Sequence, residues 1–156
     1  MEKTLLDTDI FSEILKQKHP NVVARAQRYH TVFGYYTVST ITVLEIVKGF
    51  HKAHREDDIQ RFLTAVTTAE ILTLNVKTAE LAGRIYADLE RTGQPIGRAD
   101  PVIAAIALEH HLILSTGNVS HYQYIQNLGY ALKVENWKLS HEEPTDSTDN
   151  YETLLP

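Results

Sequence analysis

The feature that most constrains the fold is an alternation of short apolar runs with longer amphipathic runs along most of the chain. The short runs suit buried strands, whereas the longer runs carry apolar residues at helical spacing. Strands that are separated by helices need crossover connections, so the pattern predicts a mainly parallel sheet of about five strands with helices on both faces, a three-layer α/β/α fold. The predicted strands are Thr4–Leu6, Thr37–Ser39, Ile71–Leu74, Leu112–Ser115 and Ala131–Val134.

The amphipathic runs place a helix or a helix pair after most strands. The predicted helices are Ile10–Lys16, Val22–Tyr29, Val43–Ala53, Asp57–Thr68, Thr78–Arg91, Pro101–His110 and Ser120–Asn127. A parallel sheet of this kind binds ligands beside the carboxyl ends of its strands, where the following helices begin. Candidate functional residues are therefore those that closely follow a strand.

The length and the charge distribution indicate one domain with a tail. The 156 residues are the size of a single domain, which we place at residues 1–139. The formal net charge of −5 arises in the final stretch "HEEPTDSTDNYETLLP", which holds acids but neither Lys nor Arg. We expect residues 140–156 to form an acidic, disordered tail.

Composition excludes several classes of protein and site. The chain has no cysteine, so disulfides and thiolate metal sites are impossible. No apolar run approaches the roughly 20 residues that span a bilayer, and the start of the chain does not resemble a signal peptide, so we expect a soluble, cytoplasmic protein without a membrane partner. The eight histidines include no His-Glu-x-x-His pattern, which disfavours a zinc centre.

Acidic and amide side chains follow the predicted strands. Asp7 comes directly after the first strand, Glu45 lies shortly after the second, and Asp100 opens the helix "DPVIAAIALEHH". Asn118 follows the fourth strand and the turn "TG". The strand-end rule predicts that these side chains converge at one edge of the sheet. Carboxylates so close together repel, and a hard divalent cation would offset that repulsion.

A purely structural role is also open for most of these residues, because Asp, Asn, Ser and Thr dominate helix N-caps. Asp9 is suited to cap the first helix, and Thr42–Glu45 reads as a capping box. Asp100 before a proline and Asn118 after a glycine are further candidate caps. Asp7 is the exception, because the pattern places it at a strand end.

Four stretches occur in the order in which PIN domains carry their motifs: "LLDTDI", "VSTITVLEIVKG", "PIGRADPVIAAIAL" and "LILSTGN". Over about residues 3–138 the chain resembles a PIN domain, and more narrowly a VapC-type toxin ribonuclease. The resemblance implies that Asp7, Glu45 and Asp100 bind a metal ion, Mg²⁺ with Mn²⁺ as a possible substitute. It also implies a PIN-like version of the three-layer fold.

Further residues are carried over from the same resemblance. Asn118 falls where the family has Asp or Asn, and Thr116 matches a hydroxyl residue that orients ligands or water. Ser12 and Arg98 are accessory candidates. Asp9 departs from the usual Asn, and we expect it to cap the helix or to support the metal ligands indirectly.

The resemblance implies a metal-dependent endoribonuclease that cleaves RNA through a metal-activated water and leaves a 5′-phosphate and a 3′-hydroxyl. It further implies a toxin that is inhibited by a cognate VapB-type antitoxin and that forms a homodimer. A catalytically silent PIN module that binds RNA or protein is the alternative. A phosphoacceptor signalling domain is disfavoured, because Asn75 stands where an acceptor aspartate should follow the third strand.

Overall fold

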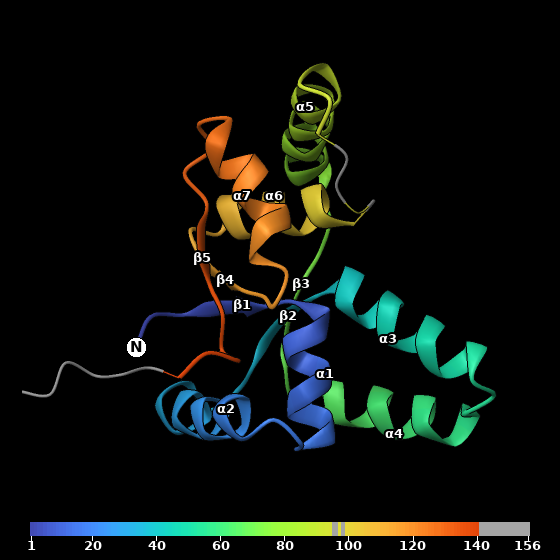
Figure 1. Cartoon of the computed structure of the whole chain (residues 1–156). Coiled ribbons are helices and arrows are strands. Elements are labelled where there is room, and N and C mark those ends of the chain that lie inside the picture. Colours follow the sequence, from blue (N-terminus) through green and yellow to red (C-terminus); the bar gives the residue numbers. More distant parts are fainter. Residues whose placement is uncertain (95–96, 98, 141–156) are drawn as a thin grey trace, which may run out of the picture.

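The structure is a computed structural model that describes residues 1–94, 97 and 99–140 (Figure 1). Its strands form one parallel sheet in the order β3-β2-β1-β4-β5. This architecture confirms the predicted fold class. The strands are β1 (Thr4–Leu6), β2 (Thr37–Ser39), β3 (Glu70–Leu72), β4 (Ile113–Ser115) and β5 (Lys133–Glu135).

Helices cover both faces of the sheet (Figure 1). Adjacent residues of β1 point to opposite faces, so Leu5 packs with α5, α6 and α7, whereas Leu6 packs with α1 to α4. The fully buried Ile103 and Trp137 belong to these two cores respectively. The helices are α1 (Thr8–Lys16), α2 (Pro20–Phe33), α3 (Thr40–Lys52), α4 (Glu56–Val66), α5 (Val76–Arg91), α6 (Asp100–Glu109) and α7 (Val119–Asn127).

The strand order reverses between β1 and β4. The chain builds β1, β2 and β3 toward one edge, and then crosses over to add β4 and β5 on the other side of β1. Leu5 lies beside Leu114 and Leu6 beside Ser115 in this central pair. In parallel sheets, the carboxyl ends of the strands at such a reversal are the usual place for ligands to bind. Asp7 and Thr116, the residues that follow β1 and β4, therefore stand at the expected place for a site.

Two of the predicted helix caps are wrong. Asp7, not Asp9, is the N-cap of α1, and its carboxylate accepts the Thr8 N–H at 2.8 Å. Ser39, not Thr42, is the N-cap of α3, and its hydroxyl accepts the Thr42 N–H at 3.2 Å. Both helices start with almost no connecting loop: Asp7 is the single residue between β1 and α1, and Ser39 both ends β2 and caps α3.

The other two caps differ as well. Asp100 is the first residue of α6, and the cap position belongs to Ala99. Asn118 occupies the N-cap position of α7, but its side chain makes no capping hydrogen bond to the described residues. Capping therefore does not account for either side chain.

Some predictions concern parts of the chain that the structure does not describe. Arg98 and the acidic segment 141–156 lie outside the described residues. Within the described part, none of the helices has the length and apolar composition to cross a membrane.

Candidate active site

Asp7 is the most deeply buried of the candidate acids, with 5% of its surface exposed. One carboxylate oxygen accepts the Thr8 N–H. The other accepts the Thr116 hydroxyl at 2.8 Å and the Tyr122 hydroxyl at 3.1 Å. The backbone N–H of Asp7 donates to the Ser115 carbonyl at 2.9 Å, which fixes it beside the end of β4. Within residues 1–94, 97 and 99–140, the three groups that donate to this carboxylate are all uncharged.

The surroundings of Asp7 favour a cation or a proton. Burial raises the pKa of Asp7 to about 6, although hydrogen bonds from Thr116 and Thr8 act in the opposite direction. The nearby charge of Asp9 contributes to this rise in the pKa of Asp7. A buried carboxylate with neutral partners and another acid nearby gains free energy when a positive ion binds.

Asp100 meets Asp7 at a shared hydroxyl group. Asp100 stands at the start of α6 with 16% of its side chain exposed. The Tyr122 hydroxyl lies 3.4 Å from Asp100 Oδ1, and His121 Nδ1 lies 3.1 Å from Asp100 Oδ2. Burial and the two carboxylates raise the pKa of Tyr122 well above its ordinary value, so it stays protonated. Because a hydroxyl has one proton, it can donate to only one of the carboxylates at a time.

Glu45 reaches the same edge from α3. It is half-buried, and its Oε1 accepts the Thr8 hydroxyl at 2.9 Å. The backbone N–H of the same threonine donates to Asp7. The Thr8 hydroxyl also lies 3.2 Å from the Thr42 hydroxyl, which ties the starts of α1 and α3 together. Thr8 therefore links Glu45 to Asp7.

The turn after β4 completes the edge. The Thr116 hydroxyl donates to Asp7 and accepts the backbone N–H of Asn118 at 3.0 Å. Asn118 is exposed at the start of α7. Asp9 faces the same turn, where it accepts the Gly117 N–H at 2.9 Å. Its second partner is the Lys138 ammonium, also at 2.9 Å.

These residues suit a divalent ion without forming a closed cage. Residues 1–94, 97 and 99–140 contain no preassembled group of three or more His, Asp or Glu side chains that could hold a metal. Mg²⁺ commonly takes only one or two carboxylates and keeps several waters, so Asp7 and Asp100 form an adequate donor pair. Asp9 Oδ2 is already paired with the Lys138 ammonium, whereas Asp9 Oδ1 is buried and has no hydrogen-bond partner among the described residues. The donor set therefore fits Mg²⁺ or Mn²⁺.

Some residues of this edge were not predicted from the sequence. Tyr122, His121 and Thr8 contact the candidate ligands, and Lys138 contacts Asp9. Tyr122 and His121 follow Asn118 by about one helical turn, which places them over the strand ends. That spacing was the available signal, but a buried tyrosine in a short helix is usually a core residue.

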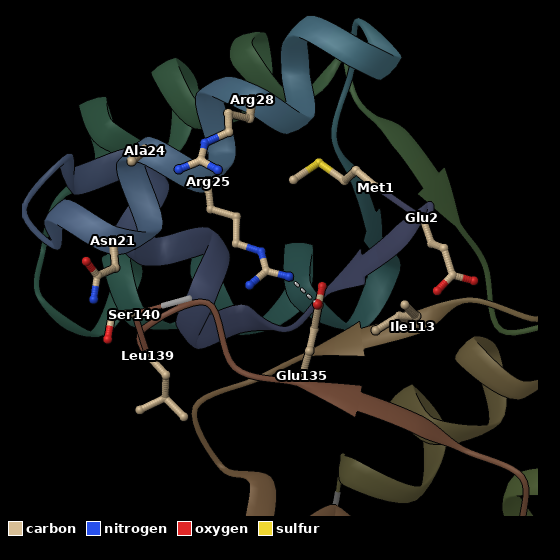
Figure 2. A pocket seen from close by; sticks show the side chains of 10 residues that line it. All are labelled: Met1, Glu2, Asn21, Ala24, Arg25, Arg28, Ile113, Glu135, Leu139 and Ser140. Atoms are coloured by element: carbon tan, nitrogen blue, oxygen red, sulfur yellow. Dashed lines mark hydrogen bonds and ion pairs between the residues drawn. The ribbon is translucent and has the colours of Figure 1, made fainter. Parts of the chain in front are cut away.

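A separate cavity of about 500 Å³ lies beside α2 and β5 (Figure 2). The Arg25 guanidinium and the Glu135 carboxylate form an ion pair at its wall. Asn21, Arg28 and Ser140 also line it. Its lining includes none of the candidate metal ligands. The cavity is therefore separate from the acidic edge, by which we mean Asp7, Asp9, Glu45 and Asp100 near the carboxyl ends of the strands.

The amino-acid sequence matches a protein-family model and is similar to named bacterial proteins. The model described as "PIN domain" matches residues 4–124. Ribonuclease VapC2 from Haemophilus influenzae is 33% identical over 141 residues, which covers 88% of this chain and 99% of that protein. The tRNA(fMet)-specific endonuclease VapC from Shigella flexneri is 28% identical over 138 residues, with the same coverage.

The fold is similar to that of solved bacterial structures. The 2.2 Å resolution structure of VapBC-1 from nontypeable Haemophilus influenzae has a TM-score of 0.72 and 27% identity, and the match covers 87% of this chain and 98% of that one. VapBC2 from Rickettsia felis, bound to a DNA fragment from its promoter, has a TM-score of 0.70 and 25% identity, with coverage of 86% and 98%. Both are similar over nearly the whole of the matched chain.

Proposed function

The chain belongs to the PIN domain family, and from this membership we propose that it is a metal-dependent endoribonuclease, the toxin of a VapBC-type toxin–antitoxin pair. The observation that carries the proposal is the meeting of Asp7 and Asp100 at the Tyr122 hydroxyl. The two acids are far apart in the sequence, and both stand at the edge of the sheet where the strand order reverses. Two relatives, each matched over 99% of its length, are named as a tRNA(fMet)-specific endonuclease and a ribonuclease.

Each residue of the edge has a role in this proposal. Asp7 and Asp100 hold Mg²⁺ or Mn²⁺, and Glu45 contacts the ion directly or through a water. When bound, such an ion lowers the pKa of a coordinated water and offsets phosphate charge. Thr116 keeps the Asp7 carboxylate in place through its hydroxyl. The exposed Asn118 amide donates to the substrate phosphate.

The reaction that we propose is hydrolysis of a phosphodiester bond. The oxygen of a water forms a bond to phosphorus, and the bond between phosphorus and the 3′-oxygen of the preceding nucleotide breaks. The leaving oxygen takes up a proton, so the products carry a 5′-phosphate and a 3′-hydroxyl. The chain contains no cysteine nucleophile, and none of the proposed roles needs a covalent intermediate.

RNA is the proposed substrate, and a VapB-type antitoxin is the proposed inhibitor. The relative from Shigella flexneri is named for cleavage of tRNA(fMet), so initiator tRNA is the first substrate to assay. The solved VapBC structures support the antitoxin. We further propose a homodimer that works in the cytoplasm, with residues 1–139 as the nuclease domain.

The test is the mapping of RNA 5′ ends after induced expression of the wild type, Asp7→Asn and Asp100→Asn. Asp57→Asn serves as the matched control, because it removes an exposed carboxylate from the first turn of α4, away from the acidic edge. New 5′-phosphate ends are expected for the wild type and the control alone. The same purified proteins should cleave initiator tRNA with Mg²⁺ and lose this activity with a chelator.

The same experiment distinguishes a catalytically silent PIN module. A silent module produces the same 5′ ends in all four strains. That result would reject the nuclease proposal, even if the protein still bound RNA or an antitoxin.

A further inference from the structure

Lys138 is held in place from two sides. Its backbone carbonyl accepts the Asn21 side-chain amide at 2.9 Å, and its backbone N–H donates to Asn136 Oδ1 at 2.9 Å. Figure 2 shows Asn21 of α2 beside the chain that leads to Ser140. The ammonium of Lys138 extends to Asp9 in α1, with 32% of the side chain exposed. The segment after β5 thus places the Lys138 ammonium beside the start of α1.

The Lys138–Asp9 ion pair lies against the turn that follows β4. Asp9 Oδ2 accepts both the Lys138 ammonium and the Gly117 N–H. A β-carbon on Gly117 would stand 2.3 Å from Asp9 Oδ2 and 2.9 Å from the Lys138 nitrogen. The absence of a side chain at Gly117 therefore lets the turn close on the pair. The preceding residue, Thr116, donates to Asp7, so the pair adjoins the proposed metal ligands.

We propose that the Lys138 ammonium is a fixed cation of the acidic edge, which neutralises Asp9 and so limits the free protein to one divalent ion, at Asp7 and Asp100. The inference rests on the metal binding of the proposed function and adds the number of ions and the residue that sets it. The adjacent Asn118 carries no charge with which to recruit a second ion. Lys138 acts through Asp9 and is a positioning residue.

The charges around Asp9 explain why the free protein binds one divalent ion and not two. With Lys138 in place, the pair has no net charge, and a second divalent ion would have to approach an ammonium. Without Lys138, the Asp9 carboxylate keeps its full charge. Its Oδ1 is already buried without a partner among the described residues, and Oδ2 loses the ammonium. A +2 ion close to a +1 charge loses affinity on the order of tenfold even in water-like surroundings.

The test is a titration of the full chain with Mn²⁺, in which electron paramagnetic resonance measures the free ion. We expect one bound Mn²⁺ for the wild type, none for Asp7→Asn over the same range, and two for Lys138→Met. Lys138→Gln should also bind two ions. Its amide can still donate to Asp9, so this variant serves as the second test if Lys138→Met folds poorly. Lys133→Met is the matched control, because Lys133 is 70% exposed on β5 and pairs with Glu2 instead; it should bind one.

A double-mutant cycle assigns the effect to the pair. Asp9→Asn leaves an unpaired ammonium at the edge, and the single Mn²⁺ should bind more weakly, on the order of tenfold. Asp9→Asn combined with Lys138→Met removes both charges, and should return to one ion with affinity near that of the wild type. A purely structural role of Lys138 would not produce this recovery.

The outcomes separate the inference from the proposed function. One ion in the wild type together with an unchanged number and affinity in both Lys138 variants would overturn the inference and leave the metal site intact. Two ions in the wild type would overturn it as well. No Mn²⁺ binding that depends on Asp7 would overturn the proposed metal site and the inference together.

Discussion

Replacing Asp7 by asparagine should make the metal-free protein more stable at neutral pH. The folded protein keeps an ionised carboxylate at Asp7 that is 5% exposed, and its hydrogen-bond donors in the described part of the chain are all neutral. Burial raises its pKa from the ordinary 3.8 to about 6. At about 1.4 kcal/mol for each pKa unit, the ionised group costs about 3 kcal/mol of the free energy of unfolding above pH 6. Asparagine has nearly the same shape and carries no charge.

The sign of the pH dependence follows from the direction of the shift. Between pH 3.8 and 6 the folded protein binds more protons at Asp7 than the unfolded chain does, so stability falls as the pH rises through this range. The Asp7→Asn variant lacks this contribution. Its advantage over the wild type should therefore be about 3 kcal/mol at pH 8 and should vanish near pH 4.

The assay is urea unfolding in the presence of a chelator between pH 4 and 8, with circular dichroism as the signal. The difference in the free energy of unfolding between the wild type and Asp7→Asn cancels the contribution of groups that titrate equally in both proteins. Asp57→Asn controls for the loss of an exposed carboxylate. If Asp7→Asn is no more stable than the wild type at pH 8, or if its advantage does not shrink in acid, the burial of the ionised Asp7 carboxylate does not destabilise the folded protein. Saturating Mn²⁺ should restore stability to the wild type alone, by about 2.7 kcal/mol at a hundred times the dissociation constant.

Three further substitutions, together with Gly49→Ala as a control, test other contacts of the edge. Thr116→Val should destabilise the protein by about 1–3 kcal/mol in urea and lower RNA cleavage, because a buried carboxylate and a backbone N–H each lose a partner. Gly117→Ala should lower the free energy of unfolding by about 1–3 kcal/mol, because its β-carbon collides with Asp9. Gly49→Ala in α3 places its β-carbon in open space and should raise the free energy of unfolding by about 0.5–1 kcal/mol. Glu45→Gln should keep the melting temperature within a few degrees but reduce cleavage at limiting Mg²⁺, since the amide oxygen can still accept the Thr8 hydroxyl.

Much of the architecture was predictable because strands and helices differ in the period of their apolar residues. Thr4–Leu6 and Thr37–Ser39 were predicted with the bounds that the structure has. The expectation that Asp7 and Asp100 share one edge followed from the strand-end rule, and the structure places both at one hydroxyl. Their role in metal binding remains a prediction.

Helix starts were less predictable, because several residues at each start could serve as the cap. "DTD" offers Asp7, Thr8 and Asp9 in succession, and "STIT" offers Ser39, Thr40 and Thr42. The structure uses the first residue of each group. The choice depends on how far the parallel ladder extends, and that is set by the neighbouring strand rather than by local preference.

The sequence by itself determined which elements form and which acids follow the strands, because both depend on neighbours within one or two helical turns. Only the tertiary structure decided that Tyr122 lies between Asp7 and Asp100 and that Lys138 neutralises Asp9. Tyr122 and Lys138 reach Asp7 and Asp9 across 115 and 129 residues of chain. Such contacts exist because β1 pairs with both β2 and β4, and the packing of distant segments around that central strand is not encoded in any local period.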